Sequence, residues 1–487
     1  MSMRLNNLAV THRDATLVDV ANLDFERGRP ITIVGESGSG KSLLAHAIMG
    51  SLPAPLTAQG SLAMDGQTYN LAEAGSRRKL WGPVMSLLPQ EPMLALDPTM
   101  RAREQVAEGA RSFTTDKRAA RQSAGTLLTS LGLGRATGAY PHTLSGGMAQ
   151  RVAFAAATIG GAPVLIADEP SKGLDERARA DLAGLLKRHI DGAGILLTIT
   201  HDLDLAREIG GDVLVMKDAH IIEQGPALEV LTQPAHPYTR RLLAAEPSNW
   251  RHPWMASKAP AHEAAPALVR GEGLAKAFGG QKLFSELSLA VHTGERLSLR
   301  GPSGSGKTTL GNVLLRLMPA DAGHVNHADA LQGGRVQKLY QDPALAFPSQ
   351  VPLRDSLGDV IRRHRLDPGR LEELMAALRL APALLTRRPG EVSGGELQRI
   401  AIIRSMLLEP ALVFADEPTS RLDLITQEET INSLMEQVHR NHCALVLVTH
   451  DNALADAVSQ RSILLGTGEE LPERANTFAS TIGTPRP

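Results

Sequence analysis

Two glycine-rich loops have the residue types that bind phosphate groups. GESGSGKS and GPSGSGKT follow the short apolar runs ITIV and LSLR, and each ends in a lysine and a hydroxyl residue. Glycines let backbone N–H groups turn toward phosphate oxygens, the lysine adds positive charge, and the hydroxyl is a Mg²⁺ ligand. We therefore predict two phosphate sites. The predicted residues are Gly35, Glu36, Ser37, Gly38, Ser39, Gly40, Lys41 and Ser42, and Gly301, Pro302, Ser303, Gly304, Ser305, Gly306, Lys307, Thr308 and Thr309.

An Asp-Glu pair follows a second apolar run in each half of the chain. The pairs are Asp168–Glu169 after VLIA and Asp416–Glu417 after LVFA. An acid at a strand end can simply cap the next helix. Downstream of a phosphate loop, however, the aspartate is expected to hold Mg²⁺ through water, and the glutamate is expected to polarise the attacking water.

A histidine ends a third apolar run in each half. His201 and His450 both lie in a Thr-His-Asp context. A single histidine at a strand end is more often structural. Because the context is repeated, we interpret both as contacts to a γ-phosphate and place them with Glu169 and Glu417 as catalytic residues.

The motifs recur in the same order, which indicates an internal duplication. LSGGMAQR is matched by VSGGELQR, and VLIADEPSKGLD by LVFADEPTSRLD. The later motifs keep a nearly constant offset, whereas the offset between the phosphate loops is longer. We predict two similar domains, 1–247 and 268–487, joined by a Pro- and Ala-rich linker at 248–267.

The short apolar runs that end at polar residues are typical of buried parallel strands. They alternate with the helical stretches 175–189 and 423–438. The pattern predicts an α/β fold with two phosphate-loop NTPase domains, whose ligands lie beyond the carboxyl ends of the strands.

Composition excludes several classes. Of 487 residues, 51 are Lys or Arg and 52 are Asp or Glu, so no protein-wide basic field can hold nucleic acid. Cys443 is the single cysteine, which excludes a disulfide framework, a cysteine zinc site and an iron–sulfur cluster. The start of the chain lacks a signal-peptide core, and no apolar run reaches membrane-spanning length. A role at a membrane would therefore require partners.

The LSGGMAQ and VSGGELQ segments resemble the signature of ABC-transporter ATPases. Each lies 23 residues before its Asp-Glu pair. The resemblance implies that each half is one nucleotide-binding domain with a helical signature subdomain. It also implies that the halves pair head to tail, so that each signature completes the ATP site of the other half. The signature residues are Ser145, Gly146, Gly147 and Gln150, facing the Lys307 site, and Ser393, Gly394, Gly395 and Gln398, facing the Lys41 site.

The resemblance assigns further residues. Gln90 and Gln341 would sense Mg²⁺ and the membrane partner, and Asp175 and Asp423 would link the two sites. Phe278, aligned with His12, would stack on adenine or would lie in a surface loop. The implied cofactors are ATP and Mg²⁺. The Mg²⁺-binding residues would be Ser42, Gln90, Asp168, Thr308, Gln341 and Asp416. Because no catalytic type is missing, we predict two competent sites, although Ala149, Lys172 and Gly173 depart from the family pattern.

The segment AHPYTRRLLAAEP at 235–247 resembles the His-Pro-Tyr-Thr extension of the peptide, oligopeptide and nickel importer branch. A plain helix start, with Pro237 in the first turn, is the alternative. The branch implies an ATPase subunit, with both ATPase domains in one chain, of an importer for peptides, nickel or metal-chelating opines.

The implied partners are two membrane permease subunits and a substrate-binding protein, at the cytoplasmic face of the bacterial inner membrane. No nucleic-acid partner is expected. Two alternatives remain open. One is a soluble tandem ABC protein that acts on ribosomes, which would normally need a long charged linker. The other is the ATPase component of a phosphonate-degrading complex.

Overall fold

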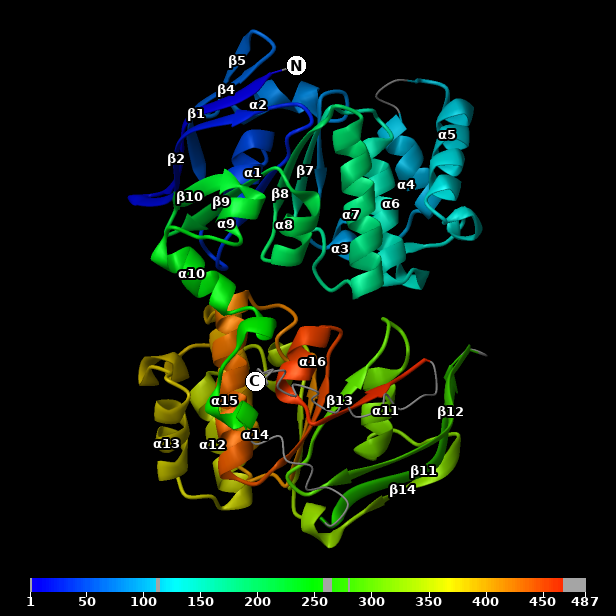
Figure 1. Cartoon of the computed structure of the whole chain (residues 1–487), viewed down its shortest axis with the longest axis vertical. Coiled ribbons are helices and arrows are strands. Elements are labelled where there is room, and N and C mark those ends of the chain that lie inside the picture. Colours follow the sequence, from blue (N-terminus) through cyan, green and yellow to red (C-terminus); the bar gives the residue numbers. More distant parts are fainter. Residues whose placement is uncertain (1, 111–113, 257–264, 279–280, 467–487) are drawn as a thin grey trace, which may run out of the picture.

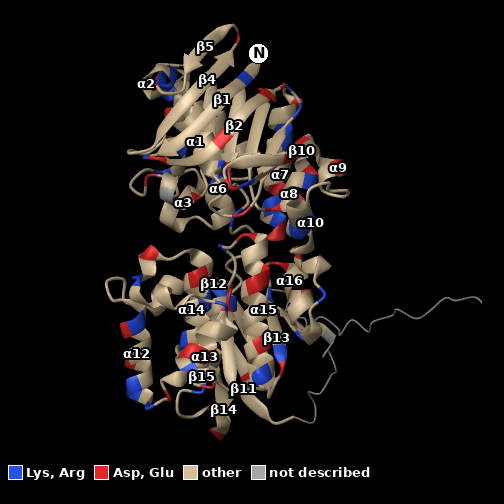
Figure 2. Cartoon of the chain, turned by 90° about the vertical axis from the view of Figure 1, so that its left-hand side faces the viewer, with Lys and Arg blue, Asp and Glu red and all other residues tan. Residues whose placement is uncertain are grey.

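The chain forms two lobes stacked along its long axis (Figure 1). The computed structural model describes residues 2–110, 114–256, 265–278 and 281–466. Lys and Arg are interspersed with Asp and Glu over both lobes (Figure 2). Within these residues, no helix combines the length and the apolar character needed to span a membrane.

A ten-stranded sheet organises the first half. Its order is β5-β4-β1-β2-β10-β9-β3-β8-β7-β6, and the run from β9 to β6 is parallel. The apolar runs predicted as strands are β3, β7 and β8, and their residues are buried because they lie inside the sheet. The strand bounds are β1 (Met3–His12), β2 (Ala15–Phe25), β3 (Ile31–Val34), β4 (Thr57–Met64), β5 (Gln67–Asn70), β6 (Met85–Leu88), β7 (Val164–Asp168), β8 (Ile195–Ile199), β9 (Asp212–Lys217) and β10 (His220–Pro226).

Three helices form a separate subdomain in this half. They are α4 (Ala102–Gly109), α5 (Lys117–Ser130) and α6 (Gly146–Thr158), and they share an alanine- and leucine-rich core. The other helices are α1 (Lys41–Met49), α2 (Ala74–Arg77), α3 (Pro92–Ala95), α7 (Glu176–Asp191), α8 (Leu203–Ile209), α9 (Ala227–Val230) and α10 (Pro237–Ala244).

The second half repeats this plan. Its five-stranded parallel sheet has the order β15-β16-β17-β13-β18, the same sequence of strands as β6-β7-β8-β3-β9. A three-stranded sheet, β12-β11-β14, lies beside it. The strand bounds are β11 (Ala267–Phe278), β12 (Gln281–His292), β13 (Arg296–Arg300), β14 (Ala322–His327), β15 (Val336–Leu339), β16 (Leu412–Asp416), β17 (Ala444–Val448) and β18 (Arg461–Leu464). The helices are α11 (Lys307–Leu314), α12 (Leu353–His364), α13 (Gly369–Ala377), α14 (Gly394–Met406), α15 (Leu424–Arg440) and α16 (Asn452–Val458).

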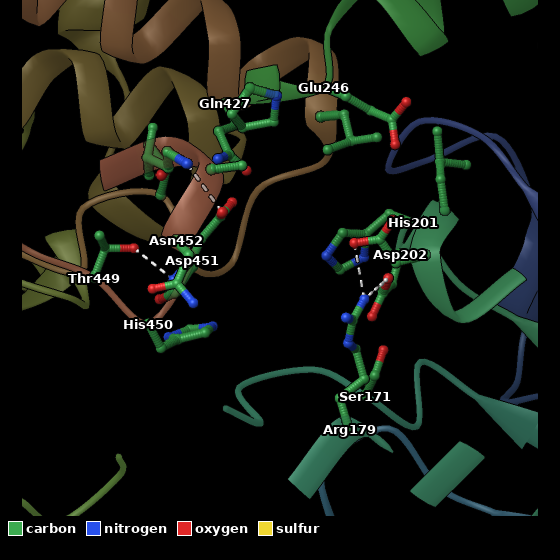
Figure 3. A pocket seen from close by; sticks show the side chains of 18 of the residues that line it. Ser171, Arg179, His201, Asp202, Glu246, Gln427, Thr449, His450, Asp451 and Asn452 are labelled. Atoms are coloured by element: carbon green, nitrogen blue, oxygen red, sulfur yellow. Dashed lines mark hydrogen bonds and ion pairs between the residues drawn. The ribbon is translucent and has the colours of Figure 1, made fainter. Parts of the chain in front are cut away.

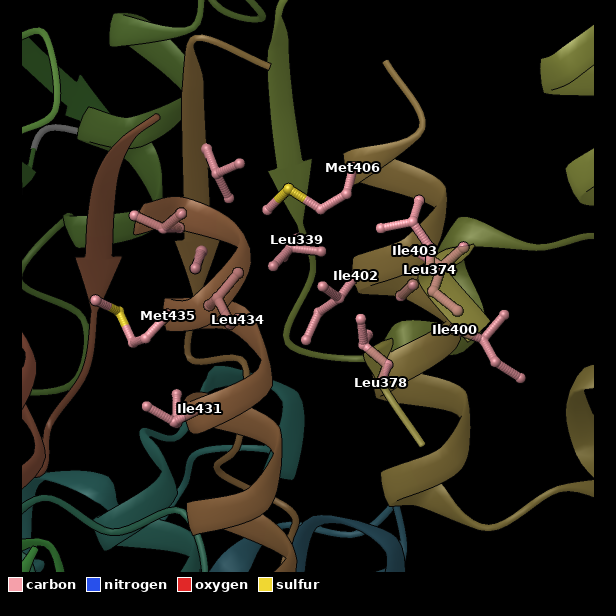
Figure 4. Packing of buried hydrophobic residues seen from close by; sticks show 14 of the residues in the cluster. Leu339, Leu374, Leu378, Ile400, Ile402, Ile403, Met406, Ile431, Leu434 and Met435 are labelled. Atoms are coloured by element: carbon pink, nitrogen blue, oxygen red, sulfur yellow. The ribbon is translucent and has the colours of Figure 1, made fainter. Parts of the chain in front are cut away.

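The largest apolar core lies in the second half, where α14 and α15 pack on the sheet through aliphatic side chains (Figure 4). Two tryptophans that precede this half belong to the same cluster. Trp250 is 1% exposed and Trp254 is 6% exposed. The Trp254 indole N–H donates to the Asn432 side chain at 2.8 Å. The chain between the two sheets is therefore anchored on the second half, and the exact domain boundaries stay a prediction.

Candidate functional site

Each phosphate loop connects the end of a buried strand to the first residue of a helix. In the first half β3 leads to α1, which begins at Lys41, and in the second β13 leads to α11, which begins at Lys307. The Lys41 ammonium donates to the carbonyls of Gly35 at 2.8 Å and Glu36 at 2.6 Å. Lys307 donates to the corresponding carbonyls of the second loop. Both loops are thus folded around their lysine.

Burial lowers the pKa of both lysines, and the neighbouring Glu169 and Glu417 carboxylates oppose that shift. Lys41 and Lys307 are each 6% exposed, and each ammonium donates to neutral backbone carbonyls. A buried cation of this kind is stabilised by a bound anion, because an anion restores the interaction lost with water. The geometry suits the oxygens of a polyphosphate.

The first glycine of each loop is required by its conformation and surroundings. Gly35 has φ 151° and Gly301 has φ 141°. A Cβ atom would lie 2.1 Å from the Met216 carbonyl oxygen in the first loop and 2.5 Å from the Leu465 carbonyl oxygen in the second. Only glycine lets the loop pass this close to the adjacent strand segment.

The hydroxyl after each lysine is bonded to the aspartate at the end of the neighbouring strand. Ser42 donates to Asp168 at 2.9 Å, and Thr308 donates to Asp416 at 2.9 Å. Burial raises the pKa of Asp168 above its ordinary value. A hydroxyl and a carboxylate are hard oxygen donors that suit Mg²⁺. Among the described residues, no group of three or more His, Cys, Asp or Glu side chains is placed to hold a metal ion.

The predicted glutamate and histidine lie together in both halves. The Nδ1 atom of His201 lies 2.7 Å from the Glu169 carboxylate, and that of His450 lies 3.4 Å from Glu417. Both glutamates have a left-handed backbone, with φ 46° and 45°. Such a conformation is strained for a residue with a side chain, and it recurs at the same position in both halves.

Each glutamate and its histidine shift the other's pKa. Burial raises the pKa of Glu169, but the charge and hydrogen bonds of His201 outweigh it and bring the pKa below its usual value. Burial lowers the pKa of His201, but the Glu169 carboxylate outweighs it and raises the pKa. The same directions hold for Glu417 and His450. The glutamates are therefore kept ionised, as a proton acceptor needs to be.

The two predicted glutamines differ in their contacts. The Gln341 amide donates to the Glu417 carboxylate at 2.9 Å and lines the pocket around Lys307. Gln90 is half-buried and follows β6, the strand at the corresponding edge of the first sheet. Both residues follow the same strand of the repeat.

Two aspartates join each half to the phosphate loop of the other. Asp423 accepts a hydrogen bond from the backbone N–H of Ser37 at 3.1 Å, and Asp175 accepts one from Ser303 at 3.1 Å. The pocket around Lys307, about 300 Å³, is accordingly lined from the first half by Gly173 and Asp175. The two halves face each other head to tail at these contacts.

Both signature serines begin a helix. Ser145 caps α6 and Ser393 caps α14, each through its hydroxyl oxygen. The described residues that line the Lys307 pocket do not include Ser145, Gly146 or Gly147. The ATP sandwich implied by the family resemblance stays a prediction.

The family described as "ABC transporter" matches this chain twice, at residues 18–172 and 284–420. The chain belongs to the ABC transporter ATPases. The matched ranges contain both phosphate loops, both signatures and both Asp-Glu pairs. The predicted family, the α/β fold of two ABC ATPase domains and the assignment as an ATPase are confirmed.

Two relatives of this ABC ATPase match it over nearly its whole length. The uncharacterised ABC transporter ATP-binding protein YejF of Escherichia coli (strain K12) is 32% identical, over 98% of this chain and 97% of the relative. The glutathione import ATP-binding protein GsiA of the same strain is 33% identical, over 95% of this chain and 84% of the relative. Both comparisons therefore extend across the two halves.

A solved structure described as "RNase-L Inhibitor" is similar in fold. The TM-score is 0.65 at 22% identity, and the match covers 94% of this chain and 87% of that one. At this level of identity the likeness concerns the fold alone.

The proposed adenine contact lies at the end of a strand. Phe278 ends β11, is 48% exposed and has the Lys276 ammonium 5.5 Å from its ring centre. His12 ends β1, the corresponding strand of the first half. The role of Phe278 toward adenine stays a prediction.

The segment at 235–247 makes a contact that sequence reasoning missed. His236 caps α10, Pro237 is its first residue, and the hydroxyl of Tyr238 accepts a hydrogen bond from the Glu36 backbone N–H at 3.1 Å. No local pattern in the sequence pairs this tyrosine with Glu36. The sequence shows only that the second loop has Pro302 where the first has Glu36.

A cavity of about 530 Å³ lies between the two halves. His201 and Asp202 line it from one side, and His450 and Asp451 line it from the other (Figure 3). Arg179 is paired there with Asp202 at 3.3 Å. The cavity connects the surroundings of the two histidines.

Proposed function

We propose that this ABC ATPase is the ATP-hydrolysing subunit of an importer for short peptides or peptide-like molecules. The observation that carries the proposal is the match across both halves to a protein named for glutathione import. Glutathione is itself a short peptide. The His-Pro-Tyr-Thr segment at 235–247, read as a mark of the peptide and nickel branch, supports the same class.

In this proposal each half binds one ATP and hydrolyses it to ADP and phosphate. Lys41 and Lys307 bind the phosphate oxygens. Glu169 and Glu417 accept a proton from the attacking water, and their pKa values below the ordinary range keep them ready to do so. His201 and His450 position these glutamates and reach the γ-phosphate.

Mg²⁺, when bound, neutralises charge on the phosphate oxygens. The Ser42–Asp168 and Thr308–Asp416 pairs are the side chains that would hold it, because they offer hard oxygen donors at the carboxyl ends of parallel strands. Gln90 and Gln341 would complete the two sites.

Closure of the halves would bring each signature to the opposite phosphate loop. Ser145 would approach the Lys307 site and Ser393 the Lys41 site. The cross-half bonds of Asp175 and Asp423 support this arrangement, since they already join the correct pairs of elements. ATP would favour closure by adding contacts to both halves, and release of phosphate would favour reopening.

Two membrane permease subunits and a substrate-binding protein would complete the transporter, at the cytoplasmic face of the inner membrane. The permeases would dock near Gln90 and Gln341. Uptake tests the proposal. A strain that lacks this gene, complemented by the wild type or by a Glu169→Gln/Glu417→Gln variant, is compared for labelled glutathione, labelled dipeptides and ⁶³Ni²⁺. We expect the strain complemented by the wild type to take up the labelled peptides and the strain complemented by the variant not to do so.

Uptake of nickel or of an opine–metal chelate without peptide uptake would assign the cargo to another class of the same branch. A chain that copurifies with ribosomes and is absent from membranes would contradict the importer. The likeness to "RNase-L Inhibitor" does not favour a ribosomal role, because it concerns the fold alone. Association with a phosphonate-degrading complex would likewise replace the proposal.

A further inference from the structure

We propose that Tyr238 is a positioning residue for the ATP site at Lys41. The loop at Lys307, which has Pro302 in place of Glu36, cannot make the same contact, so the segment 235–254 would control one of the two sites. The inference rests on the proposed ATP-binding role of the two phosphate loops. It does not depend on the cargo or on the membrane partners. Four observations carry it.

The first observation is the contact itself. The Tyr238 hydroxyl accepts from the Glu36 N–H at 3.1 Å, and its side chain is 7% exposed. Burial, together with the neighbouring Glu36 carboxylate, raises the pKa of Tyr238, so the hydroxyl stays neutral at physiological pH. The Lys217 ammonium lies 4.9 Å from the ring centre. Tyr238 is therefore packed in place and bears on the loop through a single oxygen atom.

The second observation concerns what this contact holds. The Glu36 carbonyl accepts from the Lys41 ammonium at 2.6 Å, and the next N–H, of Ser37, is held by Asp423 at 3.1 Å. The peptide groups on both sides of Glu36 are thus fixed, one by the extension and one by the second half. Because Lys41 is oriented by this backbone, the Tyr238 hydroxyl acts on the charge that binds phosphate.

The third observation is the difference between the loops. Proline stands at 302, where the first loop has Glu36, and proline has no N–H to donate. The glycines that precede these positions, Gly35 and Gly301, have similar φ values of 151° and 141°. The second loop cannot make the Tyr238 type of contact.

The fourth observation is the anchoring of the segment on the second half. Arg241 pairs with Glu428 on α15, and His252 lies 3.1 Å from the same carboxylate. Trp254 donates to Asn432 one turn further along α15. Since α15 begins after Asp423, the segment connects the helix that follows Asp423 to the loop that Asp423 touches. Movement of the second half would therefore affect the Lys41 loop through two contacts, that of Asp423 with Ser37 and that of Tyr238 with Glu36.

The experiment measures ATP affinity separately in each half. The full chain is photolabelled with 8-azido-ATP and Mg²⁺ on ice over a concentration series, and mass spectrometry follows labelled peptides from 1–247 and from 268–487. The quantity compared is the 8-azido-ATP concentration that gives half-maximal labelling of each half. Because this concentration does not depend on the maximal yield, differences in labelling yield between the halves do not affect it. For Tyr238→Phe we expect the half-saturating concentration of the first half to rise about threefold to tenfold, which is the effect of one net hydrogen bond. The half-saturating concentration of the second half should not change.

Two further variants separate positioning from general packing. Glu36→Pro removes the donor and reproduces the second loop, so Tyr238→Phe should add no further loss in that background. Glu36→Ala keeps the N–H, so the loss should persist. Tyr69→Phe is the matched control, because the Tyr69 hydroxyl donates to the exposed Gln67 side chain away from both loops. It should alter neither half.

The outcomes separate the role of Tyr238 from the assignment of the loops to ATP. If the wild type labels in neither half, the assignment of the loops to ATP is wrong. If both halves label and Tyr238→Phe changes neither of them, or changes both equally, the role of Tyr238 is wrong. A loss that persists in the Glu36→Pro background also overturns it, since the hydroxyl would then act through another group.

Discussion

Asp175 connects the two halves with one carboxylate. Its Oδ1 accepts from the backbone N–H of Ala178 and so caps α7, while its Oδ2 accepts from the N–H of Ser303 in the opposite phosphate loop. Asp423 repeats the pattern with Thr426 and Ser37. The first turn of a helix in each half is thus connected to the phosphate loop of the other half. Nucleotide binding at one loop can therefore affect the other loop through these carboxylates.

The first prediction concerns this linkage. We expect Asp175→Ala and Asp423→Ala each to lower the Hill coefficient of ATP hydrolysis toward 1 and to cost about 1–2 kcal/mol of stability, because a helix cap is lost as well. Asp116→Ala is the matched control, since Asp116 caps α5 away from the interface. It should cost similar stability and leave the Hill coefficient unchanged. If all three variants retain wild-type cooperativity, the carboxylates do not couple the sites.

The second prediction concerns the glutamates. Glu169→Gln with Glu417→Gln keeps the shape of both sites and removes both proposed bases, so hydrolysis should fall about 100-fold or more. ATP binding should persist in the photolabelling assay. Glu91→Gln, which leaves the site carboxylates intact, serves as the control. Normal phosphate release by the double variant would falsify the assignment of the bases.

The third prediction concerns the pH dependence of hydrolysis. His201 opposes the effect of burial on Glu169 and keeps the pKa of this carboxyl below its ordinary value. In His201→Asn the effect of burial remains without the opposing charge, so the pKa of Glu169 should rise. In a Glu417→Gln background, the acidic limb of the kcat profile should therefore move to higher pH. An unmoved limb would show that the pair does not set this ionisation.

The fourth prediction follows the same pair in protein stability. The pKa of His201 is raised on folding, so its contribution is fully present below its unfolded value of about 6.5. The contribution is lost as pH rises through the folded value. The pKa of Glu169 is lowered, so its contribution is present above its unfolded value of about 4.3 and is lost as pH falls through the folded value.

Urea unfolding of the wild type and His201→Asn should therefore differ most between about pH 5 and 6 and differ less above the raised pKa. His324→Asn provides a comparison, because its partner Glu272 lies 3.2 Å away on an exposed surface. Exposed pairs contribute little. A stability difference for His201→Asn that does not vary with pH would contradict the linkage.

The sequence is sufficient for the parts of the fold and site that depend on local pattern. Runs such as ITIV are short, apolar and followed by polar residues, so they are recognised as the buried strands β3, β7 and β8. The helix predicted from 175 begins after Asp175, whose side chain caps it. Contacts between segments that are distant in the sequence cannot be predicted from local pattern. Tyr238 and Glu36 are 202 positions apart, and no local pattern pairs them.

The tryptophans give a second example. Trp250 and Trp254 lie in a stretch without apolar period, which indicates a linker, yet they enter the core of the second half. Two isolated aromatic residues produce no periodic signal, although a buried tryptophan contributes a large apolar area. Their burial depends on side chains from distant parts of the chain, among them residues of α15, which is a property of the tertiary structure.

The last prediction concerns Lys338, whose strand position in the first half is a leucine. The Lys338 ammonium lies 3.4 Å from the Asp416 carboxylate, whereas the same strand position in the first half is Leu87. Both groups of the pair are largely buried, so the ammonium opposes a cation at Asp416. Lys338→Leu should lower the Mg²⁺ concentration needed for half-maximal nucleotide labelling of the second half by about twofold to tenfold, the effect of roughly 0.5–1.4 kcal/mol. Leu87→Lys should raise the requirement of the first half. Equal Mg²⁺ requirements in all three proteins would mean that Lys338 does not act on the metal site.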